Sequence, residues 1–172
     1  MAHDRRSIRL ESYDYSQLGA YFITICTQNR DCILGDIANG EMTLSELGEI
    51  VRKCWNDLPH RYPKLELDCL MVMPNHVHVI IMITDVGAIH ELPLPHNNQT
   101  DRRRMLIPKI IGFAKMNTAK RINQLRNTPG ARVWQRNYYE HVIRTDDDLK
   151  QFREYVAQNS LKWDSDEENP LY

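Results

Sequence analysis

The sequence predicts an α+β fold in which helices pack on an antiparallel β-sheet. Strand-like and helix-like segments alternate along the chain instead of forming separate blocks. Two apolar strands are separated by only Pro74 and Asn75, and a connection this short joins antiparallel neighbours. The 172 residues are 42% hydrophobic and 26% charged, which is ordinary for one globular domain and argues against a disordered or fibrous chain.

The first third of the chain is expected to hold a strand, a hairpin and a helix. Tyr21–Gln28 alternates and is rich in aromatic and β-branched residues, which is typical of a strand. Asn39 and Gly40 between two short extended segments predict a β-hairpin, because both residue types accept a positive φ. Ser45 is expected to cap a helix with apolar residues at helical spacing, and Pro59 is expected to end it.

The middle of the chain contains two strands and a basic helix. Leu65–Met73 and His76–Ile83 are apolar segments of strand length. Residues 84–104 contain prolines, paired asparagines and a triple arginine, and are expected to form a surface loop. A helix over Pro108–Arg126 is expected to follow, with the proline tolerated in its first turn.

The last part of the chain is expected to hold an extended segment, Val133–Arg144, and a final helix. Thr145 is the predicted N-cap of that helix, since three aspartates follow it in the first turn. An acidic tail over 163–172 is expected to be loosely ordered. The order of elements is most simply a ferredoxin-like βαββαβ core with additions, in a single domain over 1–172.

Several function classes are excluded by what the sequence lacks. Its apolar run Val79–Ile83 is far too short to span a membrane, and no apolar leader precedes the first strand. The four cysteines form no CxxC pair, so the usual zinc spacings are absent. No GxGxxG or Walker pattern occurs, so no nucleotide cofactor is expected. These absences favour a cytoplasmic protein without a membrane partner.

Positive charge is concentrated in one part of the chain. From Arg102 to Arg136 there are ten Lys or Arg and no Asp or Glu, although the whole chain has a net charge of −1. Such a segment indicates an anion-binding face, with a solvated helix face as the alternative. Trp134 within it is either a platform for an unpaired base or a core anchor. The candidate phosphate contacts are Arg102, Arg103, Arg104, Lys109, Lys115, Lys120, Arg121, Arg132 and Arg136.

His76 and His78 are the candidate metal ligands. Residues two apart in a strand share a face, so both imidazoles are expected to project together, while Val77 and Val79 face the other way. Two imidazoles at this spacing can bind one metal ion. The alternative is a pair of strand histidines that only form hydrogen bonds.

The longer run MPNHVHVIIMI resembles the HUH motif (His, hydrophobe, His) of the REP-associated tyrosine transposase family, a group of single-tyrosine transposases. The resemblance covers most of the chain, from YFITICTQNR through this strand to VWQRNYYEHVIR and the last helix. It implies the HUH endonuclease fold and a divalent metal, Mg²⁺ or Mn²⁺. It also implies DNA transposition by cleavage and rejoining of single-stranded or hairpin DNA.

By this resemblance, Tyr155 in REYVAQNSL matches the position of the nucleophile. Family members often read YIxxNPV here, and Ser160 replaces the proline, which puts the local end of the helix in question. Asn159 lies one turn after Tyr155 and is the candidate third metal ligand. The alternative is a tyrosine at the edge of the core and an asparagine C-cap. Tyr138 and Tyr139 are the rival nucleophiles.

The residue types fit phosphoryl transfer. A tyrosine hydroxyl has an ordinary pKa of about 10 and is a poor nucleophile at neutral pH. A bound metal would polarise the phosphate, and a 5′-phosphotyrosine link would conserve the bond energy, so no ATP is needed. Two alternatives stay open: a DNA-hairpin-binding protein that does not cleave, and a ferredoxin-like module for a small ligand or metal. A monomer or a homodimer is expected.

Overall fold

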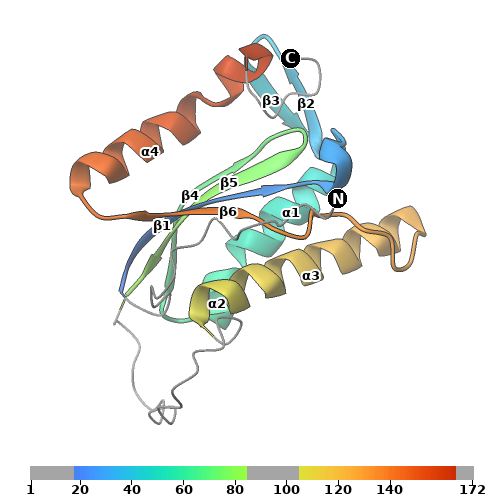
Figure 1. Ribbon diagram of the computed structural model, residues 1–172. Coiled ribbons are helices and arrows are strands. Elements are labelled where there is room, and N and C mark those ends of the chain that lie inside the picture. Colours follow the sequence, from blue (N-terminus) through green and yellow to red (C-terminus); the bar gives the residue numbers. More distant parts are fainter. Residues whose placement is uncertain (1–17, 85–104, 166–172) are drawn as a thin grey trace, which may run out of the picture.

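A four-stranded antiparallel sheet lies at the centre of the computed structural model, which describes residues 18–84 and 105–165 (Figure 1). The strand order is β4-β5-β1-β6. The strands are β1 (Gly19–Cys26), β4 (Leu65–Val72), β5 (His76–Ile83) and β6 (Tyr139–Ile143). One helix follows β1 and another follows β5, namely α1 (Glu46–Asn56) and α3 (Leu106–Arg126). The predicted α+β, ferredoxin-like βαββαβ order is confirmed.

The two faces of the sheet are covered by different helices (Figure 1). The face carrying Val77, Val79 and Ile81 packs with α1 and α3 in the larger apolar core. The opposite face packs with α4 (Asp146–Gln158) in a smaller core, in which Ile80 contacts Val156 and its neighbours. Because side chains alternate along β5, His76 and His78 point to the same side as Ile80, which is the α4 side.

The hairpin predicted at Asn39-Gly40 forms a small separate sheet. Strands β2 (Gly35–Ala38) and β3 (Glu41–Leu44) pair across these two residues. Asn39 has a φ of 54° and Gly40 a φ of 77°, which are the left-handed values that a two-residue hairpin turn of this type requires.

The capping predictions are also confirmed. The Ser45 hydroxyl accepts a hydrogen bond from the Gly48 N–H at the start of α1. The Thr145 hydroxyl accepts one from the Asp148 N–H at the start of α4. Pro59 does not simply end a helix, because it lies in the first turn of the short helix α2 (Leu58–Arg61), where a missing N–H costs nothing.

Two boundaries differ from expectation near the C-terminus. Within Val133–Arg144, only β6 is a strand of the sheet, and Trp134 instead forms an isolated bridge with Thr27 at the end of β1. After α4 the chain continues as a 3₁₀ helix, η3 (Ser160–Ser165), in which Trp163 is buried. Trp163 is therefore part of the fold and not of a loose tail, because its large apolar ring is covered.

Some expectations lie outside the described residues. These are the loop over 84–104, apart from its first residue, and the acidic tail beyond residue 165. In the described residues, no helix combines the length and the apolar character that crossing a membrane requires.

Candidate active site

His76 and His78 form a buried pair on the α4 side of the sheet. Both residues are nearly inaccessible, with relative exposures of 0% and 2%. Their Nε2 atoms lie 2.9 Å apart, and the ring centroids are 4.4 Å apart. The strand spacing therefore places both imidazoles on one face, as predicted, with the two Nε2 atoms directed at each other.

The ring tautomer of His76 follows from its neighbour. The Asn75 amide nitrogen donates to the Arg30 carbonyl oxygen at 3.2 Å, which identifies the other amide atom of Asn75 as the oxygen. This oxygen lies 2.8 Å from His76 Nδ1 and can only accept, so the ring donates from Nδ1. In the neutral ring, Nε2 of His76 then carries a lone pair.

His78 is held by β1. The Thr24 hydroxyl lies 2.8 Å from His78 Nδ1, because Thr24 and His78 are partners in the β1–β5 register. Burial, and secondly the neighbouring His76, lowers the pKa of His78 well below its ordinary value. A neutral imidazole is the form that binds metals. A hydroxyl both donates and accepts, so Thr24 can satisfy Nδ1 in either tautomer of His78.

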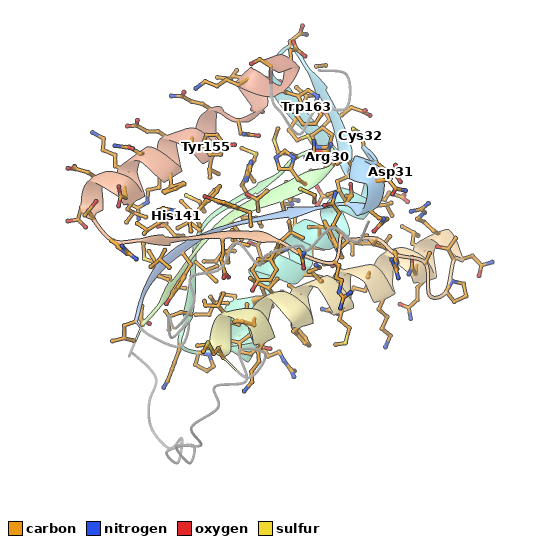
Figure 2. The ribbon with its side chains drawn as sticks, viewed as in Figure 1. Arg30, Asp31, Cys32, His141, Tyr155 and Trp163 are labelled. Atoms are coloured by element: carbon orange, nitrogen blue, oxygen red, sulfur yellow. The ribbon has the colours of Figure 1, made fainter. Side chains whose placement is uncertain are left out.

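Tyr155 on α4 lies beside this pair. Figure 2 shows Tyr155 between α4 and the sheet. Its ring centroid is 5.2 Å from that of His78, and 43% of the residue is exposed. The ring centroid of Phe22 on β1 lies 5.9 Å from that of Tyr155 and 4.6 Å from that of Phe152, which is also on α4 and stacks on Phe22. These contacts fix the rotation of α4, so that Tyr155 faces both the histidine pair and solvent.

The rival tyrosines lie differently. Tyr138 packs against the larger core on the far side of the sheet, so alternation separates it from Tyr139 as predicted. Tyr139 is 42% exposed and lies 6.3 Å from Phe22, on the same side as Tyr155. His141 lies 5.0 Å from Phe152, next to the small core.

Asn159 follows α4 directly and is buried, with a relative exposure of 2%. Its side-chain oxygen is shielded from solvent and has no hydrogen-bond partner among the described residues. Along the chain it lies between two residues that flank the histidines: Tyr155 beside His78, and Trp163, whose ring is 6.1 Å from that of His76. A buried acceptor without a donor is costly, and a cation is one group that would satisfy it.

The donor set fits a divalent cation. In the structure the two Nε2 atoms share a hydrogen bond at 2.9 Å, which is the alternative stated for this pair. Two ligand atoms about 2.1 Å from one ion and about 90° apart would be separated by about 3.0 Å, so the same ring positions also suit one shared ion. In residues 18–84 and 105–165, no three His, Cys, Asp or Glu side chains gather into a metal cluster. A candidate set among the described residues is therefore the two imidazoles together with the buried, unpartnered amide oxygen of Asn159. Nitrogen and oxygen donors of this kind suit Mn²⁺ or Mg²⁺.

The structure does not bring all predicted DNA contacts to this site. Lys109, Lys120 and Arg121 are exposed on α3, on the opposite face of the sheet from the histidine pair. Arg102, Arg103 and Arg104 lie outside the described residues. The Lys115 ammonium donates to the carbonyl oxygens of Gln135 at 2.6 Å and Arg136 at 3.1 Å, so it ties α3 to that segment.

A cavity of about 860 Å³ lies where β1 ends, near the end of the sheet at which β5 begins. Among the described residues its lining contains no carboxylate, and Arg132 and Arg136 within it are exposed. The lining residues are Gln28, Asn29, Lys115, Arg132, Trp134, Gln135, Arg136 and Asn137. Trp134 is 8% exposed, and its indole N–H donates to the Thr118 hydroxyl at 2.8 Å, so the core-anchor interpretation holds.

Sequence reasoning missed three residues that support the site: Thr24, Asn75 and Trp163. Asn75 is 0% exposed and directly precedes His76. Its position next to a candidate metal ligand was the sequence signal that could have identified it. Thr24 contacts His78 only through the pairing of strands far apart in the sequence. Trp163 depends on how the chain turns after α4, which no local pattern indicates.

Comparisons with known proteins place the chain among similar sequences and folds. No family model matches the sequence. An uncharacterized protein of Haemophilus influenzae is 38% identical over 96% of this chain and 93% of its own length. A second protein of that organism, provisionally named REP-associated tyrosine transposase, is 24% identical over 87% of this chain and 74% of its own length.

Two solved structures share the fold. One is a REP-associated tyrosine transposase bound to a REP hairpin, with a TM-score of 0.53 and 17% identity over 90% of this chain and 74% of that one. The other is a protein of Deinococcus radiodurans provisionally described as a transposase. Its TM-score is 0.50, and it is 18% identical over 87% of this chain and 98% of its own length. The chain therefore belongs to one family with the uncharacterized Haemophilus influenzae protein, and it resembles REP-associated tyrosine transposases in sequence and in fold.

Proposed function

We propose that this protein is a transposase-like enzyme that nicks and rejoins single-stranded DNA through a tyrosine nucleophile and a divalent metal. The observation that carries the proposal is the position of Tyr155, 5.2 Å from the ring of a histidine whose Nε2 faces that of His76 at 2.9 Å. A solvent-accessible nucleophile beside two directed nitrogen ligands is the arrangement that metal-assisted phosphoryl transfer needs.

In the proposed reaction the Tyr155 hydroxyl oxygen attacks the phosphorus of a DNA phosphodiester. A bond forms between this oxygen and phosphorus, and the tyrosine hydroxyl loses its proton. The bond from phosphorus to the 3′ oxygen breaks, and the departing oxygen gains one proton to become a free 3′-hydroxyl, so the step is neutral in protons. The product is a 5′-phosphotyrosine. Attack of a 3′-hydroxyl on that link reverses the step, so neither an oxidant nor a nucleotide triphosphate is consumed.

The metal would be held by His76, His78 and the Asn159 amide oxygen. When bound, it would neutralise charge that develops on the phosphate oxygens. The chain contributes orientation: Asn75 and Thr24 fix the two imidazoles, and the stacking of Phe152 on Phe22 fixes the helix that carries Tyr155. Both histidines are buried, so the protein itself holds the two rings in place.

Hairpin DNA is the proposed substrate class. The name of one structural neighbour describes it as bound to a REP hairpin, which supports this choice by analogy. The cavity at the end of β1, with Arg132 and Arg136 on its lining, is the proposed path of the strand toward the histidines, since guanidinium groups bind phosphates. The exposed cations of α3 lie on the other face and would contact a different part of the DNA.

The test uses a 3′-labelled single-stranded DNA with a hairpin, incubated with Mn²⁺ and analysed by denaturing electrophoresis. The wild-type protein is expected to give a covalent adduct that carries the 3′ fragment. Tyr155→Phe should abolish the adduct, because phenylalanine cannot attack phosphorus. The fold should survive with a loss of less than about 1.5 kcal/mol, the scale of one hydrogen bond.

Tyr139→Phe is the matched control. Tyr139 has nearly the same exposure as Tyr155, 42% against 43%, and both rings lie against Phe22. Only Tyr155 is also stacked edge-on to His78 at 5.2 Å. Loss of the adduct in Tyr139→Phe but not in Tyr155→Phe would move the nucleophile to Tyr139. Absence of an adduct with the wild-type protein on all hairpins tested would favour a DNA-binding protein that does not cleave.

A further inference from the structure

We propose that the β2–β3 hairpin is a positioning element for the histidine pair, acting through Leu161 and Trp163. The hairpin lies outside the four-stranded sheet and contributes no residue to the candidate donor set. It nevertheless contacts the chain on both sides of that set. The part of the proposal that concerns metal affinity rests on the function proposed above.

The base of the hairpin is tied to the turn that precedes His76. The Leu34 N–H, next to the start of β2, donates to the Pro74 carbonyl oxygen at 2.9 Å. The Ser45 N–H, next to the end of β3, donates to the Leu34 carbonyl oxygen at 2.9 Å. Leu34 is itself fully buried. The start of the hairpin is therefore hydrogen-bonded to Pro74, which lies two residues before His76, the first candidate metal ligand.

The tip of the hairpin touches η3. A Cβ atom added to Gly40 would lie 2.7 Å from Leu161 Cδ2 and 3.6 Å from Leu161 Cα. Figure 1 shows the same proximity, with the C-terminal turns next to β2 and β3. Leu161 is 70% exposed, so its contact with the glycine is not part of a surrounding core. A side chain at position 40 would therefore displace the end of the Leu161 side chain, while the backbone of η3 lies at van der Waals distance from the turn.

From Leu161 the path returns to the site through Trp163. Trp163 is 9% exposed, and its ring centroid lies 6.1 Å from that of His76 with the planes inclined by 37°. The Lys162 N–H donates to the Asn159 carbonyl oxygen at 3.1 Å, so η3 also fixes the residue that carries the third candidate ligand. The hairpin thus sets where η3 lies, and η3 sets the wall of the site formed by Trp163 and Asn159.

The test adds a side chain at Gly40 and compares it with an identical change elsewhere. Gly40→Asn keeps a residue type that accepts a left-handed backbone and places side-chain atoms against Leu161. Gly130→Asn is the control, because Gly130 has a φ of 78°, against 77° at Gly40, and nothing lies within 4 Å of its added Cβ. Both variants carry the same backbone cost, and only the first meets η3.

Two readouts are measured on the full chain. Isothermal titration with Mn²⁺ should show binding about tenfold weaker in Gly40→Asn than in Gly130→Asn, the scale typical for residues that orient metal ligands. In the metal-free protein, the indole N–H resonance of Trp163 should shift in Gly40→Asn and stay in place in Gly130→Asn. The resonance is assigned with Trp163→Phe. The double variant Gly40→Asn, Leu161→Ala should regain affinity, because the clash is removed.

Two results overturn the inference. One is a Gly40→Asn protein that matches Gly130→Asn in both readouts, which would show that η3 absorbs the added side chain. The other is a double variant as impaired as Gly40→Asn, which would show that the effect does not run through Leu161. If the wild-type protein binds no Mn²⁺, the proposed metal site fails, whereas the Trp163 resonance still decides whether the hairpin positions η3.

Discussion

Removing the Thr24 hydroxyl tests whether the histidine pair is organised for metal binding. Thr24→Val keeps the shape of the side chain and deletes the hydroxyl that lies 2.8 Å from His78 Nδ1. His78 Nδ1 is then buried without this partner, which should lower the free energy of unfolding by about 1–3 kcal/mol. His78 also loses the contact that fixes its ring, so Mn²⁺ affinity should fall about 10- to 100-fold, equivalent to about 1.4–2.7 kcal/mol.

Thr118→Val separates the two effects. Thr118 is also buried, and its hydroxyl accepts from the Trp134 indole N–H at 2.8 Å, on the other side of the sheet. It should lower stability on the same scale and leave Mn²⁺ affinity unchanged. Urea unfolding and isothermal titration at pH 7 provide the two numbers. Equal loss of affinity in both variants, or wild-type affinity in Thr24→Val, would refute the argument that Thr24 orients a metal ligand.

Three further outcomes follow from the contacts described. Arg153 donates to Asp68 at 2.8 Å and holds the pKa of that carboxyl below its ordinary value of 3.8. Because the pKa of Asp68 is lower in the folded than in the unfolded state, the pair stabilises the fold above pH 3.8, and its contribution disappears as the pH falls below that value. Urea unfolding midpoints of wild type and Asp68→Asn should therefore differ at pH 7 and converge in acid. Replacing Arg132 and Arg136 together by Ala should weaken hairpin DNA binding. It should also reduce the slope of the logarithm of the binding constant against the logarithm of the salt concentration by up to about 2, as measured by fluorescence anisotropy. An unchanged slope would mean that these residues do not contact the DNA. Thr145→Ala deletes the N-cap hydroxyl of α4 and should cost about 1 kcal/mol in urea unfolding. A neutral result would mean that this capping hydrogen bond adds no stability.

Local rules of sequence account for much of the fold. The hairpin at Asn39-Gly40 and the caps at Ser45 and Thr145 depend on the conformations and hydrogen bonds of adjacent residues, so the sequence alone predicts them. The common face of His76 and His78 follows in the same way from the two-residue repeat of a strand. Where competing local signals meet, as at Pro59, prediction of the boundary fails.

Features that depend on the pairing of distant segments could not be predicted. The 2.8 Å contact of Thr24 with His78 requires the register of β1 and β5, which a hydrophobic pattern does not specify between two alternating strands. The positive charge counted along the chain similarly carries no information about which face α3 covers. Lys109, Lys120 and Arg121 of α3 are exposed, but they lie across the sheet from the histidines.

The two halves of the candidate site differ in how firmly they are attached. The histidines belong to β5, a central strand hydrogen-bonded on both edges, whereas Tyr155 belongs to a helix whose fully covered apolar side chain is Val156 alone. Segments with little buried apolar surface open at lower free energy than central strands. Hydrogen exchange should therefore release the α4 amides by a local opening that leaves β1 and β5 closed. In such an opening Tyr155 and Asn159 would leave the histidine pair together and return to it. Under the function proposed above, a DNA end bound to Tyr155 would then move away from the pair and back without unfolding of the sheet.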